Sequence, residues 1–429
     1  MRFRRSAIAV LLAVVLPGCG EQPKAKPVSK PVATIWSSLP KRGPQSEQTR
    51  LVERAIRGAV YDLRGLQRGY RVRYLPLDDS SSVATGWDPA IVAANARRAS
   101  TNPTTLAYIG EYDSGATAVA LPILNQLGIL QLSPASTAEG LTMPGVGAGP
   151  GAPYQYYPSG RRTLARLVAR DSLQGAVIAA LARGDRCRGL GIVDDGSTYG
   201  AGLSAIAASE AAPRGMRVRF AGTVDPRDEG YRRQLRKATA GCILYSGQPG
   251  STSVRVVDDI ARRNRRSKIY LPDALATPAF ANPARGGIRP GTAKRVTLTV
   301  PVGPLEAQPP LGRQVLGKVG GLPGNLRSPY VASAYAAAEL ALRCINRAFK
   351  ETKLAPARAG KTRRAVVACA VGKGHRSAAI GEYRVGRKGD WSKRVYSRFR
   401  IKDGRIVFAG ELKTPKLVAS PTPNNQASG

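Results

Sequence analysis

Short apolar runs alternate along this chain with longer segments whose apolar residues repeat at helical spacing. Leu106 to Gly110 is a continuous apolar run, typical of a strand that is buried on both faces of a parallel sheet. From Gln48 to Leu63 the apolar residues instead follow one face of a helix. Because the two patterns keep alternating, the sequence predicts an α/β fold built on parallel sheets.

The alternation continues as far as Val300. Asp88-Pro89 is predicted to cap and begin a helix that runs to Ala99, since Asp is a good N-cap and Pro fits the first helical position. Another helix is expected after Ser114. Further strands are predicted at 70–77, 129–133, 189–193, 217–224, 243–246, 269–271 and 296–300, and further helices at 171–182, 199–212, 228–238, 252–264 and 334–348.

The chain is too long for one hydrophobic core. Single cores stop growing at roughly 250–300 residues, so 429 residues with 43% hydrophobic and 22% charged content predict two globular lobes. Two Gly- and Pro-rich stretches interrupt the alternation. Thr142 to Gly160 is predicted to be a loop, and Gly303 to Pro329 a helix-poor connection.

The chain is strongly basic, with 66 Lys and Arg against 28 Asp and Glu and a formal net charge of +38. Its basic residues occur in scattered pairs such as Arg97-Arg98 and Arg232-Arg233, with no accompanying run of aromatic residues for stacking on bases. This distribution argues against a nucleic-acid partner. It indicates a solvated basic surface, which an anionic envelope surface would tolerate.

The N-terminus has the pattern of a secretory signal peptide. Three positive charges within residues 1–5 precede an apolar stretch from Ala7 to Leu16, which is too short to span a membrane. The motif Leu16-Pro17-Gly18-Cys19 resembles the bacterial lipobox, although Pro17 is unusual there. We therefore expect residues 1–18 to be removed, Cys19 to be lipidated and the mature chain to be anchored outside the cytoplasm. A soluble secreted form is the alternative.

The sequence after this motif is rich in Pro and Lys, and residues 19–31 are predicted to be a tether. The tail at 413–429 is rich in Pro, Ser and Asn and is predicted to be disordered. The remaining cysteines form an even set, which fits two disulfides in an oxidising compartment. Because none has Cys-x-x-Cys spacing and His375 is the only histidine, we expect no metal site and no cofactor.

Three segments resemble the type I periplasmic solute-binding proteins of the branched-chain amino acid (Leu/Ile/Val) receptor family, which are components of ABC importers. The first contains Ile109–Thr117, Leu121–Ile129 and Ser133–Thr137, the second is Asp194–Leu203, and the third is Tyr330–Leu342. The resemblance extends over about residues 32–412. It implies two doubly wound parallel-sheet lobes that are joined by a three-crossing hinge and hold a ligand between them.

The resemblance also implies boundaries and partners. Lobe 1 would contain residues 32–169 and 300–380, and lobe 2 residues 170–299 and 381–412. The protein would be a monomer that binds an amino acid or amide, passes it to membrane permease subunits and performs no catalysis. The alternative is an envelope lipoprotein of the same fold that acts as a sensor or cell-wall synthase activator without transport.

Seven residues match the positions at which the family binds its ligand. Ser114, Ala135 and Thr137 would hold the α-carboxylate and α-ammonium groups, and Asp273 would accept from the ammonium. Tyr199 and Tyr330 would wall the cleft. From local sequence alone, Ser114 is equally an N-cap and Asp273 a turn residue. Two acidic residues beside Ser114, Glu111 and Asp113, are expected to form a solvated rim.

The seventh residue marks a departure from the family. Where the branched-chain receptors have a Tyr after the strand at 243–246, this chain has Gln248, and its amide favours a polar or amide ligand. The family's Trp in the first strand-to-helix loop is also absent, and residues 37–39 stand nearest to that place. By the family topology, Cys187 would pair with Cys242 and Cys344 with Cys369.

The sequence offers little for an enzyme. His375, the only histidine, lies in a basic segment, so an acyl-transfer triad lacks its usual base. Gly189-Leu190-Gly191 falls inside a predicted strand, and the chain has no Gly-rich loop followed by Lys-Ser or Lys-Thr. We therefore expect a binding protein.

Overall fold

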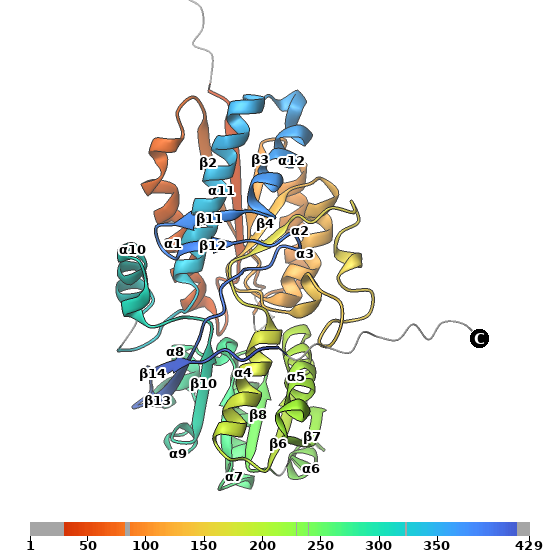
Figure 1. The fold of residues 1–429 in the computed structure, drawn as a ribbon, viewed down its shortest axis with the longest axis vertical. Helices are drawn as coiled ribbons and strands as arrows, with labels where there is room; N and C mark the ends of the chain where they lie inside the picture. The colour runs from red at the N-terminus through yellow and green to blue at the C-terminus, as the bar shows by residue number, and fades with distance from the viewer. Residues whose placement is uncertain (1–29, 82–85, 229, 239, 322–323, 418–429) are drawn as a thin grey trace, which may run out of the picture. The chain divides into compact units, whose positions relative to one another are not determined.

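The computed structural model describes residues 30–81, 86–228, 230–238, 240–321 and 324–417 (Figure 1). The predicted signal peptide, Cys19 and nearly all of the tether lie outside the described residues, as does the end of the tail. Within the described part, the strands form two large sheets and one small hairpin. Each large sheet is covered by helices on both faces, as an α/β fold requires.

The first sheet has five strands in the order β2-β1-β3-β4-β5, and every neighbouring pair is parallel. Its strands β1, β3, β4 and β5 are almost wholly buried, because helices lie against both faces. The strands are β1 (Val32–Leu39), β2 (Arg71–Asp78), β3 (Thr105–Ile109), β4 (Leu130–Ser133) and β5 (Leu164–Arg166).

Five helices cover the first sheet. On one face, α2 and α3 bury Val92 and Ala120 against Trp36 and Tyr108 of the strands. On the other face, α1 packs against α11, and α11 packs against α12. The helices are α1 (Ser46–Asp62), α2 (Pro89–Thr101), α3 (Ser114–Gln126), α11 (Val331–Thr352) and α12 (Ala359–Ala370).

The second sheet has seven strands in the order β14-β13-β10-β9-β8-β6-β7. The five strands from β10 to β7 are parallel, whereas β13 and β14 add to the β10 edge in antiparallel pairing, which the sequence did not predict. The strands are β6 (Gly189–Asp194), β7 (Arg217–Thr223), β8 (Cys242–Ser246), β9 (Lys268–Leu271), β10 (Val296–Val300), β13 (Tyr396–Lys402) and β14 (Arg405–Leu412).

Helices α4 and α5 cover one face of the second sheet, and α6 and α7 contribute to the core on the other face. The Ser197 hydroxyl caps α5 by accepting from the Gly200 N–H at 3.0 Å. The helices are α4 (Asp171–Gly184), α5 (Thr198–Ala211), α6 (Tyr231–Lys237), α7 (Ser251–Arg263), α8 (Pro278–Ala281), α9 (Pro290–Ala293) and α10 (Pro310–Gln314).

Within the described residues, the chain passes between the two sheets three times. The passages follow β5, β10 and β12, where β12 (Gly381–Arg384) pairs with β11 (Gly374–Ser377) in the small hairpin. This arrangement of two doubly wound sheets joined by three crossings is the fold class that the resemblance implied.

Several sequence-based assignments were incomplete. Strand β1 was not predicted, and residues 37–39 belong to this strand and not to the loop after it. The predicted helix at 228–238 begins later, at Tyr231. The connection at 303–329 contains α10, which continues into a π-helix at Val315–Val319. The loop at 142–160 was predicted correctly, since only a short 3-10 turn at Tyr154–Tyr156 interrupts it.

The structure forms two disulfides, and they are the pairs that the family topology implied. Cys187 pairs with Cys242 with their Cα atoms 5.8 Å apart, and Cys344 pairs with Cys369 at 5.5 Å. Both Cα separations lie within the range that a disulfide needs. The second pair joins α11 to α12, so it ties together two helices that cover the first sheet.

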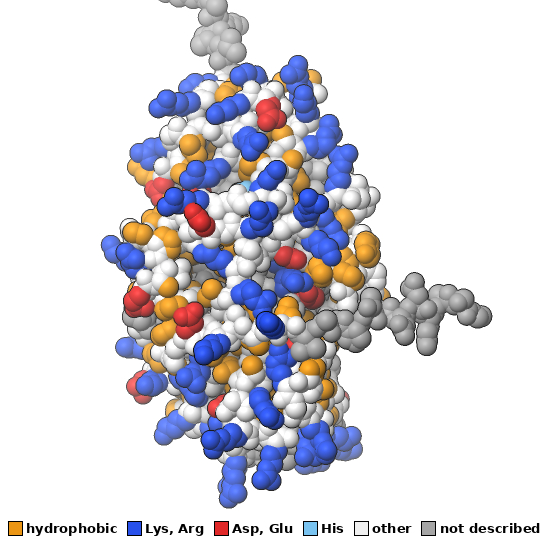
Figure 2. All heavy atoms as spheres, in the orientation of Figure 1, with side chains coloured by type: hydrophobic (Ala, Val, Ile, Leu, Met, Phe, Trp, Pro, Cys, Tyr) orange, Lys and Arg blue, Asp and Glu red, His pale blue; other side chains and the backbone are white. Residues whose placement is uncertain are grey.

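Lys and Arg side chains are spread over the face of the molecule drawn in Figure 2 and are not gathered in one patch. In the part of the chain that the structure describes, no helix is both long and apolar enough to cross a membrane. Residues 413–417 precede the end of the described chain, and Arg214 donates to the carbonyl of Lys416 at 2.9 Å.

Candidate functional site

A small cavity is lined by residues that follow strands of both large sheets. In open parallel sheets, ligands bind beyond the carboxyl ends of the strands, where the strand order reverses. The order reverses between β1 and β3 in the first sheet and between β6 and β8 in the second. The structure brings all seven predicted ligand residues to this cavity, with four others: Ser114, Ala135, Thr137, Tyr199, Gln248, Asp273 and Tyr330, and then Gln45, Tyr112, Asp113 and Ala274.

The cavity has a volume of about 20 Å³, which is room for about one water molecule. Contacts between α1 and the segment that follows β9 of the second sheet hold the walls of the cavity together. The Gln48 amide donates to the Ala276 carbonyl at 2.8 Å, and Glu47 forms an ion pair with Arg285 at 2.9 Å. A molecule larger than a water molecule would therefore enter only if the walls separate.

On the side of the first sheet, the backbone after β4 turns sharply and presents Ala135 and Thr137. The Ser133 hydroxyl accepts from the Ser136 N–H at 2.9 Å and fixes this turn. The Ser114 hydroxyl accepts from the Ala138 N–H at 3.2 Å. Ser114 is the first residue of α3 and is not its N-cap. A hydrogen bond therefore joins the start of α3 to the turn after β4 at the cavity wall.

Arg166, at the end of β5, holds Thr137 in position. Its fully buried guanidinium donates to the Ala138 carbonyl at 2.9 Å and to the Ser136 carbonyl at 3.3 Å. These hydrogen bonds hold the backbone on both sides of Thr137. Asp390 accepts from the same guanidinium at 3.0 Å. Burial alone would raise the pKa of Asp390, but Arg166 and the neighbouring Arg170 hold it below its ordinary value.

On the side of the second sheet, Asp273 is almost fully buried and accepts from two tyrosines. The Tyr199 hydroxyl donates to Oδ1 at 2.8 Å, and the Tyr330 hydroxyl donates to Oδ2. Burial raises the pKa of Asp273, and the two hydroxyls oppose this rise. Because Tyr330 precedes α11 and Asp273 follows β9, the cluster connects the two lobes.

Gln248 follows β8 and lines the cavity on the side of the second sheet. Its backbone N–H donates to Asp195 Oδ2 at 2.6 Å, which fixes the loop after β8. Its side-chain oxygen accepts from the Gln45 amide at 3.3 Å. This contact joins the points in the two sheets at which the strand order reverses.

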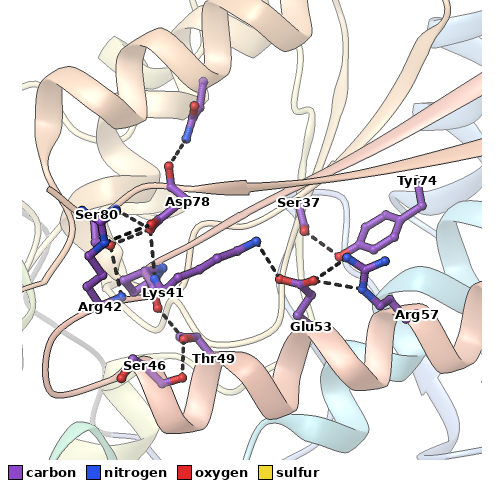
Figure 3. Close-up of polar contacts among 12 residues, drawn as sticks. Ser37, Lys41, Arg42, Ser46, Thr49, Glu53, Arg57, Tyr74, Asp78 and Ser80 are labelled. Atoms are coloured by element: carbon purple, nitrogen blue, oxygen red, sulfur yellow. Dashed lines mark hydrogen bonds and ion pairs between the residues drawn. The ribbon is translucent and has the colours of Figure 1, made fainter.

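The loop after β1 places Gln45 at the cavity. The Lys41 backbone N–H donates to Asp78 Oδ1 at 3.0 Å, and the Arg42 N–H donates to the Ser80 hydroxyl at 3.1 Å (Figure 3). Asp78 ends β2, the neighbour of β1. The loop is thus fixed to the adjacent strand, and Gln45 follows it at the start of α1.

The expectation that Glu111 and Asp113 form a solvated rim is wrong. Glu111 is fully buried and Asp113 is 4% exposed. The Tyr108 hydroxyl donates to Glu111 Oε1 at 2.6 Å, and the Gln45 amide donates to Asp113 Oδ1 at 2.8 Å. Burial raises the pKa of each carboxyl to about 7. A third acid, Asp79, is fully buried beside them, and burial raises its pKa as well.

Sequence reasoning missed Gln45, Tyr112 and Ala274. The Tyr112 ring packs edge-on against Tyr330 with centroids 5.4 Å apart, and its hydroxyl donates to Gln48 at 2.6 Å. Tyr112 precedes Ser114 by two residues, so its place in the recognised segment was an available signal. No local signal marks Gln45, because 68 residues separate it from Asp113.

Asp171 was also missed. It begins α4, is fully buried, and its backbone N–H donates to the Thr137 carbonyl at 3.0 Å. Burial raises the pKa of Asp171 well above its ordinary value. Asp171 does not line the cavity, so it acts there only through the position of Thr137. The cavity itself offers Asp273 as an acceptor for an ammonium group and the start of α3 as a donor to a carboxylate.

The lining does not resemble a metal site. Among the described residues, no group of three or more His, Cys, Asp or Glu side chains is arranged to hold a metal ion. His375 lies in β11, and its Nε2 is 2.9 Å from the Ala370 carbonyl oxygen. It is not among the residues that line the cavity.

Solved structures that are similar to this chain include substrate-binding proteins. Leucine-binding protein LivK from Thermotoga maritima matches 89% of this chain and 98% of its own, with a TM-score of 0.69 and 21% identity. LivJ from Streptococcus pneumoniae, a branched-chain amino acid transporter substrate-binding protein solved with isoleucine, matches 90% of this chain and 100% of its own (TM-score 0.65, 17% identity).

A solute-binding protein of an ABC transporter from Rhodopseudomonas palustris, solved with benzoate, matches 90% of this chain and 99% of its own. Its TM-score is 0.65 at 14% identity. No protein-family model matches the chain, and no curated protein matches it either. The fold of this protein is that of the type I periplasmic binding proteins, with LivK and LivJ among its structural neighbours.

Proposed function

We propose that this protein is the extracytoplasmic substrate-binding lipoprotein of an ABC importer, and that it binds an amino acid or amide without chemical change. One observation carries the proposal. Seven residues chosen from the sequence, which lie between positions 114 and 330, line a single cavity at the reversal points of both sheets. Structural neighbours that bind isoleucine or benzoate support a small-molecule ligand.

Each end of a zwitterion has complementary groups in this cavity. The first N–H groups of α3 lack partners within the helix, and together with the Ser114 hydroxyl they suit a carboxylate. Thr137 and Asp273 supply oxygen acceptors for the ammonium group. The ligand stays between the lobes because it contacts both of them and therefore favours the closed arrangement.

The proposed function also places the protein at the cell membrane. Cys19, outside the described residues, would carry the lipid that anchors the protein to the outer face of the cell membrane. The protein would act as a monomer and deliver its ligand to permease subunits of the importer. Its spread of basic side chains suits an anionic envelope surface.

Thr137→Ala tests the ligand-binding role. The substitution removes a hydroxyl that contacts the invariant end of any amino acid, so every ligand should lose roughly 1.5–3 kcal/mol of binding free energy. Thr101→Ala, at an exposed position at the end of α2, is the matched control and should change nothing. Calorimetry with a panel of amino acids and amides measures both. Equal affinities for the two variants would contradict the proposal.

Gln248→Tyr tests the assignment of the side-chain end. Because an amide favours polar ligands, its replacement should shift preference toward apolar side chains. The same calorimetric panel reports the ranking. If Gln248→Tyr changes every affinity by one common factor, Gln248 does not face the ligand side chain.

The second candidate function is an envelope lipoprotein that acts as a sensor or cell-wall synthase activator without transport. The small volume of the cavity favours it, because about 20 Å³ holds no amino acid unless the walls separate. Failure of the whole panel to bind, together with a radius of gyration that no ligand changes, would support this alternative.

A further inference from the structure

Asp113 lines the cavity without a structural role that accounts for its charge. It immediately precedes α3, where an Asp commonly caps the helix, yet its side chain makes no capping hydrogen bond. Oδ1 accepts from the Gln45 amide, whereas the buried Oδ2 has no partner among the described residues. Burying a carboxylate oxygen without a donor is costly. Other buried acids in the described part of the chain also have such oxygens, but Asp113 is the one of them that lines the cavity, where a ligand could supply the donor.

The charge of the lining points to the class of that ligand. Among the described residues that line the cavity, Asp113 and Asp273 are acidic and none is Lys or Arg, although the chain carries a formal net charge of +38. A neutral zwitterion would bring one ammonium to two carboxylates and would add a third carboxylate of its own. A ligand with a second positive charge leaves less uncompensated negative charge in this enclosed space.

Asp113 lies at the end of the cavity where the ligand side chain is expected. The Gln45 amide nitrogen donates both to Asp113 Oδ1 at 2.8 Å and to the Gln248 oxygen at 3.3 Å, so these three side chains are neighbours. Asp273 belongs instead to the cluster with Tyr199 and Tyr330. The two acids therefore have separate partners in one cavity.

We propose that Asp113 accepts hydrogen bonds from a cationic group on the ligand side chain, so that the preferred ligand is an amino acid with a guanidinium or ammonium side chain. The inference rests on the proposed function, since it assigns the side-chain end of the same site. As the lobes separate, the Gln45–Gln248 contact breaks and the ligand cation takes a place beside the Oδ2 atom. A guanidinium suits this place well, because its several N–H groups can reach Asp113 and the Gln248 oxygen together.

The test compares ligands that differ in charge but hardly in shape. L-arginine and L-citrulline have the same length and differ in a guanidinium against a neutral urea group. Calorimetry on the full mature chain should give at least tenfold tighter binding of arginine. L-lysine against L-norleucine repeats the comparison with an ammonium group. Asp113→Asn, which keeps the size of the side chain, should reduce the arginine-to-citrulline ratio by tenfold or more.

Two control variants separate this effect from others. Asp225→Asn removes the same charge from a side chain that is 44% exposed in the loop after β7, and it should leave the ratio as it is. Thr137→Ala should weaken arginine and citrulline by one common factor. A ratio that stays the same in Asp113→Asn, or tighter binding of citrulline to the unmodified protein, would overturn the inference.

The result also separates this inference from the proposed function. If leucine or glutamine binds and Thr137→Ala weakens it, while arginine and lysine do not bind, the protein is a receptor and the role of Asp113 is wrong. If no amino acid or amide in the panel binds, both proposals are contradicted.

Discussion

The cavity contains two buried carboxylates whose surroundings differ. Both oxygens of Asp273 accept from tyrosine hydroxyls, one from each lobe. Asp113 has one glutamine donor and one oxygen without a partner. A buried acid whose hydrogen bonds are complete contributes to the closed arrangement, whereas an incomplete one costs stability unless a ligand supplies the missing donor. Asp273 therefore connects the two lobes, beside its proposed part in ligand binding, and the unpaired oxygen of Asp113 supports its proposed role in selectivity.

The largest expected effect is on the pH dependence of stability at Asp113. Burial raises its pKa to about 7, so between pH 4 and 7 the folded state keeps a proton that the unfolded state has lost. Stability should fall as the pH rises through this window and stay reduced above it. Asp113→Asn removes this loss and should stabilise the protein at pH 8 by up to about 4 kcal/mol, with no gain at pH 4.

Urea unfolding at pH 4, 6 and 8 measures this effect. The neighbouring titratable groups are the carboxyls of Asp79 and Glu111 and the phenol of Tyr112, and they remain in the variant. The two carboxyls leave a residual slope in the same window, whereas burial raises the pKa of the Tyr112 phenol well above it. Asp225→Asn should keep the full slope of the unmodified protein. An Asp113→Asn variant that is less stable at pH 8 would contradict the account of Asp113 as an incompletely bonded acid.

The next effect concerns Asp273. Tyr330→Phe removes one of its two donors and leaves a buried carboxyl oxygen without a partner, so the free energy of unfolding should fall by roughly 1–3 kcal/mol. Tyr335→Phe, five residues later and within α11, is the matched control, because the Tyr335 hydroxyl donates to the exposed Asp62 at 2.9 Å. Urea unfolding of both variants at pH 8 should show the smaller loss for Tyr335→Phe. Equal losses would remove the distinction between the two acids.

The smallest effect is expected at the contact between the two amides. Gln248→Ala deletes the 3.3 Å hydrogen bond from Gln45 but leaves Asp113 with its donor, so stability should change by less than about 1 kcal/mol. The same variant should shift the lobes toward an open arrangement, which small-angle scattering detects as a larger radius of gyration. A loss of stability as large as that of Tyr330→Phe would instead give this contact the connecting role assigned to Asp273.

Much of the fold was predictable because parallel strands that are buried on both faces have continuous apolar sequences. Strand β1 was missed because it contains the polar residues Thr34, Ser37 and Ser38 although it is buried. Hydrogen bonds to residues that are distant in the sequence compensate for the loss of water around these buried hydroxyl groups. The Thr34 hydroxyl is 2.7 Å from that of Thr104, and the Ser37 hydroxyl is 2.7 Å from that of Tyr74. Such long-range pairs leave no periodic signal in the sequence.

The candidate site shows the same limit. Residues such as Ser114 and Thr137 were identified because they lie in recognisable segments at the ends of strands. Asp113 was predicted to lie on a solvated rim, whereas it is buried and its donor, Gln45, lies 68 residues earlier in the sequence. The tyrosine donors of Asp273 come from two lobes and were predicted only as walls. The sequence therefore predicted which residues would line the cavity. Which of the two carboxylates has hydrogen-bond donors for both of its oxygens depends on tertiary structure.

The most direct test is a crystal structure of the mature protein with the tightest-binding amino acid of the calorimetric panel. The account predicts that the ligand lies in this cavity, with its α-carboxylate at Ser114, its α-ammonium at Thr137 and Asp273, and a side-chain cation within hydrogen-bonding distance of Asp113 Oδ2. The cavity walls should be farther apart than in the present structure. A ligand seated elsewhere, with the Gln45–Gln248 contact intact and the cavity still closed, would contradict the account.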